Sequence, residues 1–171
     1  LAPEGLNDLR LLKDDIEYPE IERLYSSPML RAKQTGAVLY PEKQIIPVEE
    51  LKEYDFGSFE GKTAAELESN PDFLPWTSGK LTAPPGGEEN SDFIKRVCIG
   101  FNRIAVDMVN GGYKSAAVIM HGGAIMMLLA AAGIPRRSPV EWTSENGRGY
   151  SLLVTPSLYF KSGAFEVYGI I

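Results

Sequence analysis

Two segments of the sequence carry a polar side chain just after a predicted strand. Arg31 lies in the first turn of a helix that Ser27-Pro28 begins, because Ser caps free N–H groups and Pro fits the first helical position. His121, the only histidine of the chain, follows the apolar run Ser115–Met120 and precedes Gly122-Gly123. Ligands of open α/β sheets bind at the carboxyl ends of strands, and helix starts favour anions. The guanidinium of Arg31 has a fork geometry suited to phosphate oxygens, so the two segments predict a phosphate site.

A third candidate is Glu53, in the segment Leu51–Gly57. Each of the three candidates also has an ordinary interpretation when it is taken alone. Arg31 would be a solvated helix residue, His121 a structural or exposed histidine, and Glu53 a surface charge. No cluster of Cys and His residues has the spacing of a zinc site, so the sequence predicts no metal ion. Cys98 falls in the apolar stripe of a predicted helix, which favours core packing over a role as nucleophile.

The composition limits the class of protein and its partners. A length of 171 residues with 44% hydrophobic and 23% charged residues fits one globular domain. The net charge of −6 disfavours a nucleic-acid partner, so a small anionic substrate would depend on a few local cations. The longest apolar run near a helix, Ala124–Gly133, is too short to span a bilayer, and one cysteine cannot form an internal disulfide. We therefore predict a cytoplasmic protein without a membrane partner.

The elements that must position these residues alternate between strands and helices. In the first half we predict a helix at Gly5–Ile16, a strand at Ile21–Ser26, a helix from Ser27 to Leu39, an edge strand at Gln44–Val48, a helix from the capping box at Thr63, and a long surface loop at Asn70–Asn90. In the second half we predict a helix at Ser91–Asn110, a strand covered on both faces at Ser115–Met120, a buried helix at Ala124–Ala132, and a hairpin of Tyr150–Thr155 with Ala164–Ile170. This alternation predicts an α/β fold with a mostly parallel sheet and helices on both faces.

Several motifs together resemble the histidine phosphatase superfamily, also called the phosphoglycerate mutase-like family. Tyr25–Thr35 is similar to its Ser-Ser-Pro…Arg-Ala…Gln-Thr motif, and Glu53–Gly61 to its Glu…Asp-Phe-Gly…Glu-Gly motif. His121-Gly122-Gly123 resembles the family's second histidine motif, and Pro85–Glu88 its Pro-Gly-Gly-Glu segment. The similarity covers nearly the whole chain in the family's order. It implies a single three-layer domain over residues 1–171.

The resemblance implies a phosphomonoesterase that uses a phosphohistidine and needs neither cofactor nor metal. Arg31, His121 and Gly122 would bind the phosphoryl oxygens, and Glu53 would give a proton to the leaving alkoxide. The partner would be a small phosphorylated metabolite, with an α-ribazole phosphatase-like or a broad specificity. The resemblance leaves the substrate's organic part open. Phe73, Trp76 and Arg148 could line a lid over the site.

One family motif, the N-terminal Arg-His-Gly that carries the nucleophile, is absent from the sequence. We expect its strand to precede Leu1 and to lie inside the sheet, because its loss would leave backbone groups unpaired. Two other functions stay open. One is a phosphoglycerate or sugar-phosphate mutase, and the other is a non-catalytic phosphate-binding module if the chain truly starts at Leu1. A homodimer is also open, since the C-terminal hairpin could supply an edge for pairing.

Overall fold

The computed structural model describes residues 1–171, whose strands form two three-stranded sheets, β2-β1-β3 and β4-β6-β5. The helices are α1 (Pro3–Asp15), α2 (Leu30–Leu39), α3 (Ala64–Leu67), α4 (Phe73–Thr77), α5 (Asn90–Gly111), α6 (Gly122–Ala132) and α7 (Pro156–Ser162). The strands are β1 (Arg23–Ser26), β2 (Ile45–Pro47), β3 (Ala116–Ile119), β4 (Gly133–Ile134), β5 (Tyr150–Leu153) and β6 (Phe165–Ile170). The predicted α/β fold class is confirmed.

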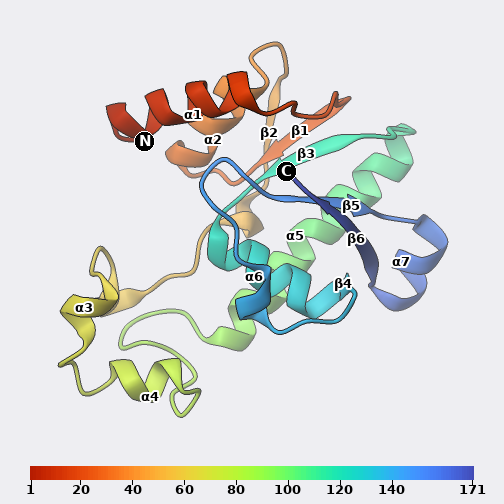
Figure 1. Ribbon diagram of the computed structural model, residues 1–171. Helices are drawn as coiled ribbons and strands as arrows, with labels where there is room; N and C mark the ends of the chain where they lie inside the picture. Colours follow the sequence, from red (N-terminus) through yellow and green to blue (C-terminus); the bar gives the residue numbers. More distant parts are fainter.

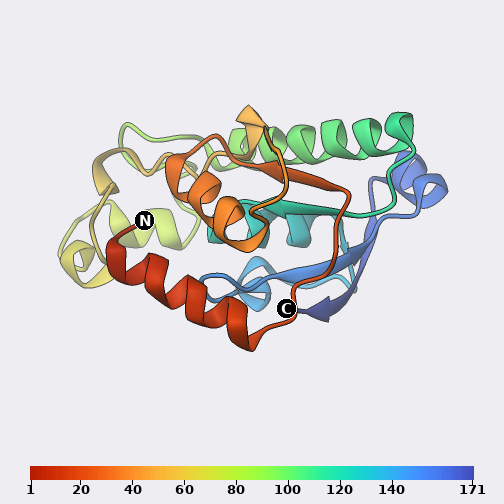
Figure 2. The same cartoon turned by 90° about the horizontal axis from the view of Figure 1, so that it is seen from above.

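The first sheet is parallel and brings two predicted site segments to one edge. β1 pairs with β2 on one side and with β3 on the other, in a register that places Ser26 beside Ile119. The carboxyl ends of β1 and β3 therefore lie together, and the chain continues from them toward α2 and α6. Helices α1 and α5 lie on opposite sides of these strands (Figures 1 and 2).

The main hydrophobic core forms where α5 packs against α6, and residues of β1 and β6 also contribute to it. Val97 of α5 and Phe165 of β6 are fully buried there, and Leu128 of α6 and Trp142 are nearly so. The apolar stripe predicted for Ser91–Asn110 is therefore the core face of α5. This helix ends at Gly112, whose φ of +69° favours glycine. Helix α5 contacts segments that carry the candidate site residues and supports them.

Several sequence predictions differ from the structure in detail. Strand β3 lies at an edge of its three-stranded sheet, and its residues are only half-buried, which is less burial than its apolar run predicted. An apolar run shows that a segment is suited to burial, but not how many strands flank it. Helix α2 begins at Leu30 rather than at Ser27. The predicted loop Asn70–Asn90 contains α4, and the two C-terminal strands pair antiparallel as predicted but are joined through α7 rather than a tight turn.

Other local predictions are confirmed. The capping box at Thr63 forms, since its hydroxyl accepts from the backbone N–H of Glu66 and the Glu66 side chain accepts from the N–H of Thr63. Strand β2 lies at an edge of the sheet, as Pro47 predicted.

Among the helices of the structure, none combines the length and the apolar character of a membrane span.

Candidate functional site

The segment between β1 and α2 is held tightly against β3. Ser26 and Ser27 are fully buried, and the N–H of Ser27 donates to the carbonyl of Ile119 at 2.8 Å. The N–H of Met29 donates to the Ser27 hydroxyl at 3.3 Å. The turn from strand to helix is thus fixed by backbone hydrogen bonds. It places Arg31 in the first turn of α2, as predicted, with the guanidinium exposed to solvent.

His121 follows β3 at the same edge and contacts both Arg31 and Ser27. Its side chain is 7% exposed. Nε of Arg31 donates to Nδ1 of His121 at 3.2 Å, and Nε2 of His121 lies 2.8 Å from Oγ of Ser27. A guanidinium N–H can only donate, so Nδ1 must be unprotonated. The imidazole is therefore the neutral tautomer with its proton on Nε2, and that proton is donated to Ser27.

The electrostatics of the site favour this neutral form. Burial, then the positive charges of Arg31 and Arg96, lower the pKa of His121 from 6.5 to about 4. The histidine is consequently uncharged near neutral pH in the absence of a ligand. An anion that replaces the guanidinium contact would reverse this balance.

The free energy of unfolding should depend on pH because of the lowered pKa of this histidine. In the unfolded chain the pKa of His121 is near 6.5, whereas in the folded chain it is about 4. Between these pH values the unfolded chain therefore binds a proton that the folded chain does not bind. The free energy of unfolding should therefore fall as the pH drops through this window, by about 2 kcal/mol between pH 7 and pH 5 from this group. Urea unfolding at the two pH values measures the change.

His121 is the only histidine, so one imidazole NMR signal follows the same titration directly. Its midpoint should lie near pH 4. The variant His121→Gln cannot titrate and should lose this part of the pH dependence. A midpoint at the ordinary value of 6.5 would contradict the proposed burial and charge effects.

Glu53 reaches the same site from a different segment. Its carboxylate accepts from the N–H of Tyr54 at 2.9 Å and from the N–H of Gly123 at 3.3 Å. A Cβ on Gly123 would lie 2.7 Å from Oε1 of Glu53, so this approach requires glycine. The structure therefore brings Glu53 to the start of α6, two residues after His121. Gly122 occupies the first position of α6, where a backbone N–H has no partner within the helix.

The three predicted residues Arg31, His121 and Glu53 thus converge, but two of their contacts were missed in the sequence. Ser27 lies in the Ser-Ser-Pro motif, but the sequence assigned it no role. Its position at the end of β1 was the signal that could have identified it as a site residue. Arg96 of α5 contacts the carbonyl of Glu53 at 3.3 Å. Its place in an amphipathic helix gave no hint of that contact.

The predicted lid residues lie in two places. The ring of Trp76 stacks on Tyr54, with centroids 6.0 Å apart and planes at 25°, and Phe73 lies 6.3 Å from Trp76. Tyr54 follows Glu53 directly, so this aromatic cluster is adjacent to the candidate site in the chain. Arg148 instead pairs with Glu145 at 3.3 Å in the loop before β5. A lid role is therefore consistent with the aromatic residues, while Arg148 already has a partner.

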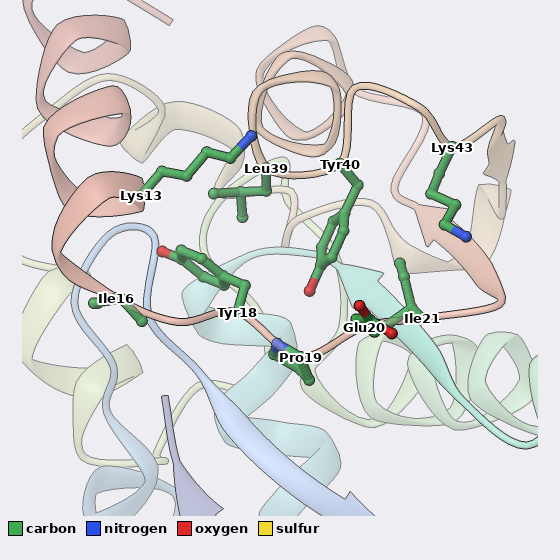
Figure 3. A pocket seen from close by; sticks show the side chains of 9 residues that line it. All are labelled: Lys13, Ile16, Tyr18, Pro19, Glu20, Ile21, Leu39, Tyr40 and Lys43. Atoms are coloured by element: carbon green, nitrogen blue, oxygen red, sulfur yellow. The ribbon is translucent and has the colours of Figure 1, made fainter.

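Two cavities lie outside this constellation. One of about 480 Å³ is lined by two tyrosines, three charged residues and four apolar residues: Tyr18, Tyr40, Lys13, Glu20, Lys43, Ile16, Pro19, Ile21 and Leu39 (Figure 3). Its segment Ile16–Ile21 precedes β1, so it is at the opposite end of that strand from Arg31. A second cavity, of about 260 Å³, is lined by Phe56, Trp76 and other residues around α3 and α4.

Comparison with known proteins identifies similar chains. A sequence model of the histidine phosphatase superfamily (branch 1) matches residues 1–156. The chain is 32% identical over 142 residues to "Putative phosphoserine phosphatase 2" of Hydrogenobacter thermophilus, covering 78% of this chain and 68% of that protein. It is also 36% identical to mycobacterial proteins, but spans only 31% of their length.

Solved structures show the same fold. The α-ribazole phosphatase of Shigella flexneri superposes with a TM-score of 0.70 at 18% identity, over 96% of this chain and 79% of that one. Phosphoglycerate mutase of Bacillus anthracis superposes with a TM-score of 0.74 at 18% identity, over 99% of this chain and 80% of that one. At these identities the similarity concerns the fold alone.

Proposed function

Because this chain belongs to the histidine phosphatase superfamily, we propose that it is a phosphomonoesterase for a small phosphorylated metabolite. The observation that carries the proposal is the meeting of Arg31, His121 and Glu53 at the carboxyl ends of β1 and β3. One cation, one imidazole and one carboxylate are the groups that phosphoryl transfer needs for positioning and proton transfer. The phosphatase name of the Hydrogenobacter relative supports hydrolysis as the reaction.

The proposed reaction proceeds in two steps through a phosphohistidine. A histidine nitrogen attacks phosphorus, the P–O ester bond breaks, and the leaving alkoxide takes a proton from Glu53. Water then attacks phosphorus, the P–N bond of the phosphohistidine breaks, the Glu53 carboxylate accepts a proton from that water, and inorganic phosphate leaves the regenerated histidine. The ring nitrogens of His121 are bonded to Arg31 and Ser27. We therefore do not assign the nucleophile to His121; in the family this role belongs to the histidine of an Arg-His-Gly motif, which the 171 residues do not contain.

Phosphate binding requires a change at His121. The unprotonated Nδ1 cannot donate to a phosphoryl oxygen, and Arg31 must turn its Nε–H from Nδ1 toward the ligand. A bound dianion favours a charged imidazole. We propose that Nδ1 takes up a proton as phosphate binds, so that Arg31 and His121 both donate to the phosphoryl group, with the N–H of Gly122 as a further donor.

The decisive test is the dependence of the rate on the leaving group in Glu53→Gln. Alkyl phosphates release a basic alkoxide that needs a proton, so the turnover number on them should fall by about 100-fold or more. p-Nitrophenyl phosphate releases a weakly basic phenolate, and the loss on it should be much smaller. Steady-state kinetics with both substrates measures the difference.

Glu49→Gln provides the matched control for this test. Glu49 is exposed, lies four residues from Glu53 and pairs only with Lys52. Its replacement should leave both rates within about twofold, as for a surface substitution. An equal loss on both substrates in Glu53→Gln would refute the acid role.

Two other functions would give different results in such kinetic measurements. A mutase would transfer the phosphoryl group to an acceptor instead of water. The shared fold with phosphoglycerate mutase is compatible with this reaction. A non-catalytic module would bind phosphate without turnover. The proposed substrate is an α-ribazole phosphate-like or serine phosphate-like ester, or a broad set of esters. A single domain, a cytoplasmic location and a homodimer all stay predictions.

A further inference from the structure

Glu53 lies in a stretch of backbone that cannot hold its own position. Residues 52–56 form neither helix nor strand, and only a short 3-10 turn, Glu49–Leu51, precedes them. A carboxylate that transfers a proton must be held within a fraction of an ångström, which requires support from neighbouring residues. Besides the N–H of Tyr54, which binds the carboxylate from within this stretch, further support must come from contacts outside it.

Arg96 of α5 provides that support with all of its donors. Nη1 donates to the carbonyls of Glu50 at 2.7 Å and Lys52 at 2.9 Å, and Nη2 donates to the carbonyl of Glu53 at 3.3 Å. Nε and Nη2 also donate to the two carboxylate oxygens of Glu88, each at 2.8 Å. A guanidinium has five N–H donors, and here each has an acceptor.

Glu88 connects this contact to a second segment. Its carboxylate neutralises Arg96 in a bidentate pair whose side chains are only 25% and 18% exposed. Its backbone N–H donates to the carbonyl of Asp55 at 2.9 Å, and its carbonyl accepts from the Tyr54 hydroxyl at 2.6 Å. The segment around Glu88 therefore holds the residues just after Glu53, while Arg96 holds those just before it.

We propose that Arg96, together with Glu88, is a positioning residue that sets the location of the Glu53 carboxylate for proton transfer. This inference rests on the proposed acid role of Glu53. Arg96 touches neither substrate nor reacting atoms in this assignment, and it supports Glu53 through the backbone of residues 50–53. Lysine could not replace it, because an ammonium group has three donors and no planar fork.

The test compares Arg96→Lys with Arg103→Lys. Arg103 lies on the same helix and pairs with the side chain of Glu50 at 2.5 Å, but it makes no hydrogen bond to the backbone of residues 50–53, and its side chain is 64% exposed. In Arg96→Lys the turnover number on an alkyl phosphate should fall by about 30-fold, with a loss of about threefold on p-nitrophenyl phosphate. Inhibition by vanadate should stay within about threefold, because Arg31 and His121 remain in place. Arg103→Lys should leave all three values near those of the parent protein.

Glu88→Gln serves as a second variant if Arg96→Lys folds poorly. It keeps the shape and one acceptor while removing the charge, so it should show the same leaving-group dependence with a smaller loss, about fivefold. In Glu53→Gln, adding Arg96→Lys should cause no further loss on the alkyl ester, because the group being positioned is already gone.

The outcomes separate this inference from the proposed function. A leaving-group effect in Glu53→Gln that is absent from both Arg96→Lys and Glu88→Gln overturns the positioning role and leaves the acid role intact. Absence of the effect in Glu53→Gln itself overturns the acid role and the inference with it. Equal losses on both substrates in Arg96→Lys, matched by weaker vanadate inhibition, would show a merely structural residue and also overturn the inference.

Discussion

Replacing Arg31 by alanine should weaken the binding of vanadate and inorganic phosphate by about 100-fold. Hydrogen bonds from a charged group contribute about 1.5–3 kcal/mol each, so the loss of one or two of them corresponds to this factor. The guanidinium lies in the first turn of α2 and is exposed, so a ligand can reach it without unfolding the segment. Inhibition constants from competition with a chromogenic substrate measure the change.

A second effect makes this prediction depend on pH. The charge of Arg31 is one cause of the lowered pKa of His121, and Nε of Arg31 also donates to its Nδ1. Without Arg31 the pKa of His121 should rise toward its ordinary value. The imidazole then becomes charged more readily in acid, so the loss of phosphate affinity should be smaller at pH 5 than at pH 7.

Lys33→Ala is the control for long-range charge. Lys33 is exposed on the same helix, and its removal changes the net charge by the same amount. We expect its effect on vanadate inhibition to stay within about twofold, because exposed charges are screened by solvent and salt. If Arg31→Ala behaved like Lys33→Ala, Arg31 would not be part of the phosphate site.

Replacing Gly123 by alanine should reduce turnover of alkyl phosphates by about 100-fold without lowering stability. The new Cβ would lie 2.7 Å from Oε1 of Glu53 and 3.4 Å from its Cδ. The obstructing atoms are the end of a flexible side chain, so the carboxylate can move away at little cost to the fold. Alanine is also favoured over glycine in a helix, by up to about 1 kcal/mol. The melting temperature should therefore stay constant or rise while activity falls.

Gly122→Ala separates the steric contact from the change in helix propensity. Gly122 lies one residue earlier in α6, and a Cβ there would meet no atom within 4 Å. Its replacement should give a similar gain in stability and should leave Glu53 in position. Thermal unfolding and alkyl phosphate kinetics on both variants make the comparison. Equal activity in the two variants would contradict the close approach of Glu53 to Gly123.

Short-range patterns in the sequence were enough to predict most elements, and the family-like motifs supplied the candidate site residues. The capping box at Thr63, the helical stripe of α5 and the first-turn position of Arg31 all depend on residues within a few positions of one another. Such patterns report helix starts and buried faces directly, because they reflect local backbone preferences. The motif containing His121 likewise marked the end of β3 correctly.

The sequence could not predict how these segments meet. Glu53 and Gly123 are 70 residues apart, and His121 and Ser27 are 94 apart, yet both pairs are in contact. The sequence also overestimated the burial of β3, because an apolar run shows that a strand is suited to burial but not which elements cover it.

By itself, the sequence determined the family-like motifs, the order of strands and helices, and the three residue types at the site. Only the tertiary structure decided the tautomer of His121, through its bonds to Arg31 and Ser27, and the support of Glu53 by Arg96. The physical reason is that local propensity depends on neighbours in sequence. The protonation and placement of a side chain instead depend on the donors, charges and burial that strand pairing and helix packing bring to it.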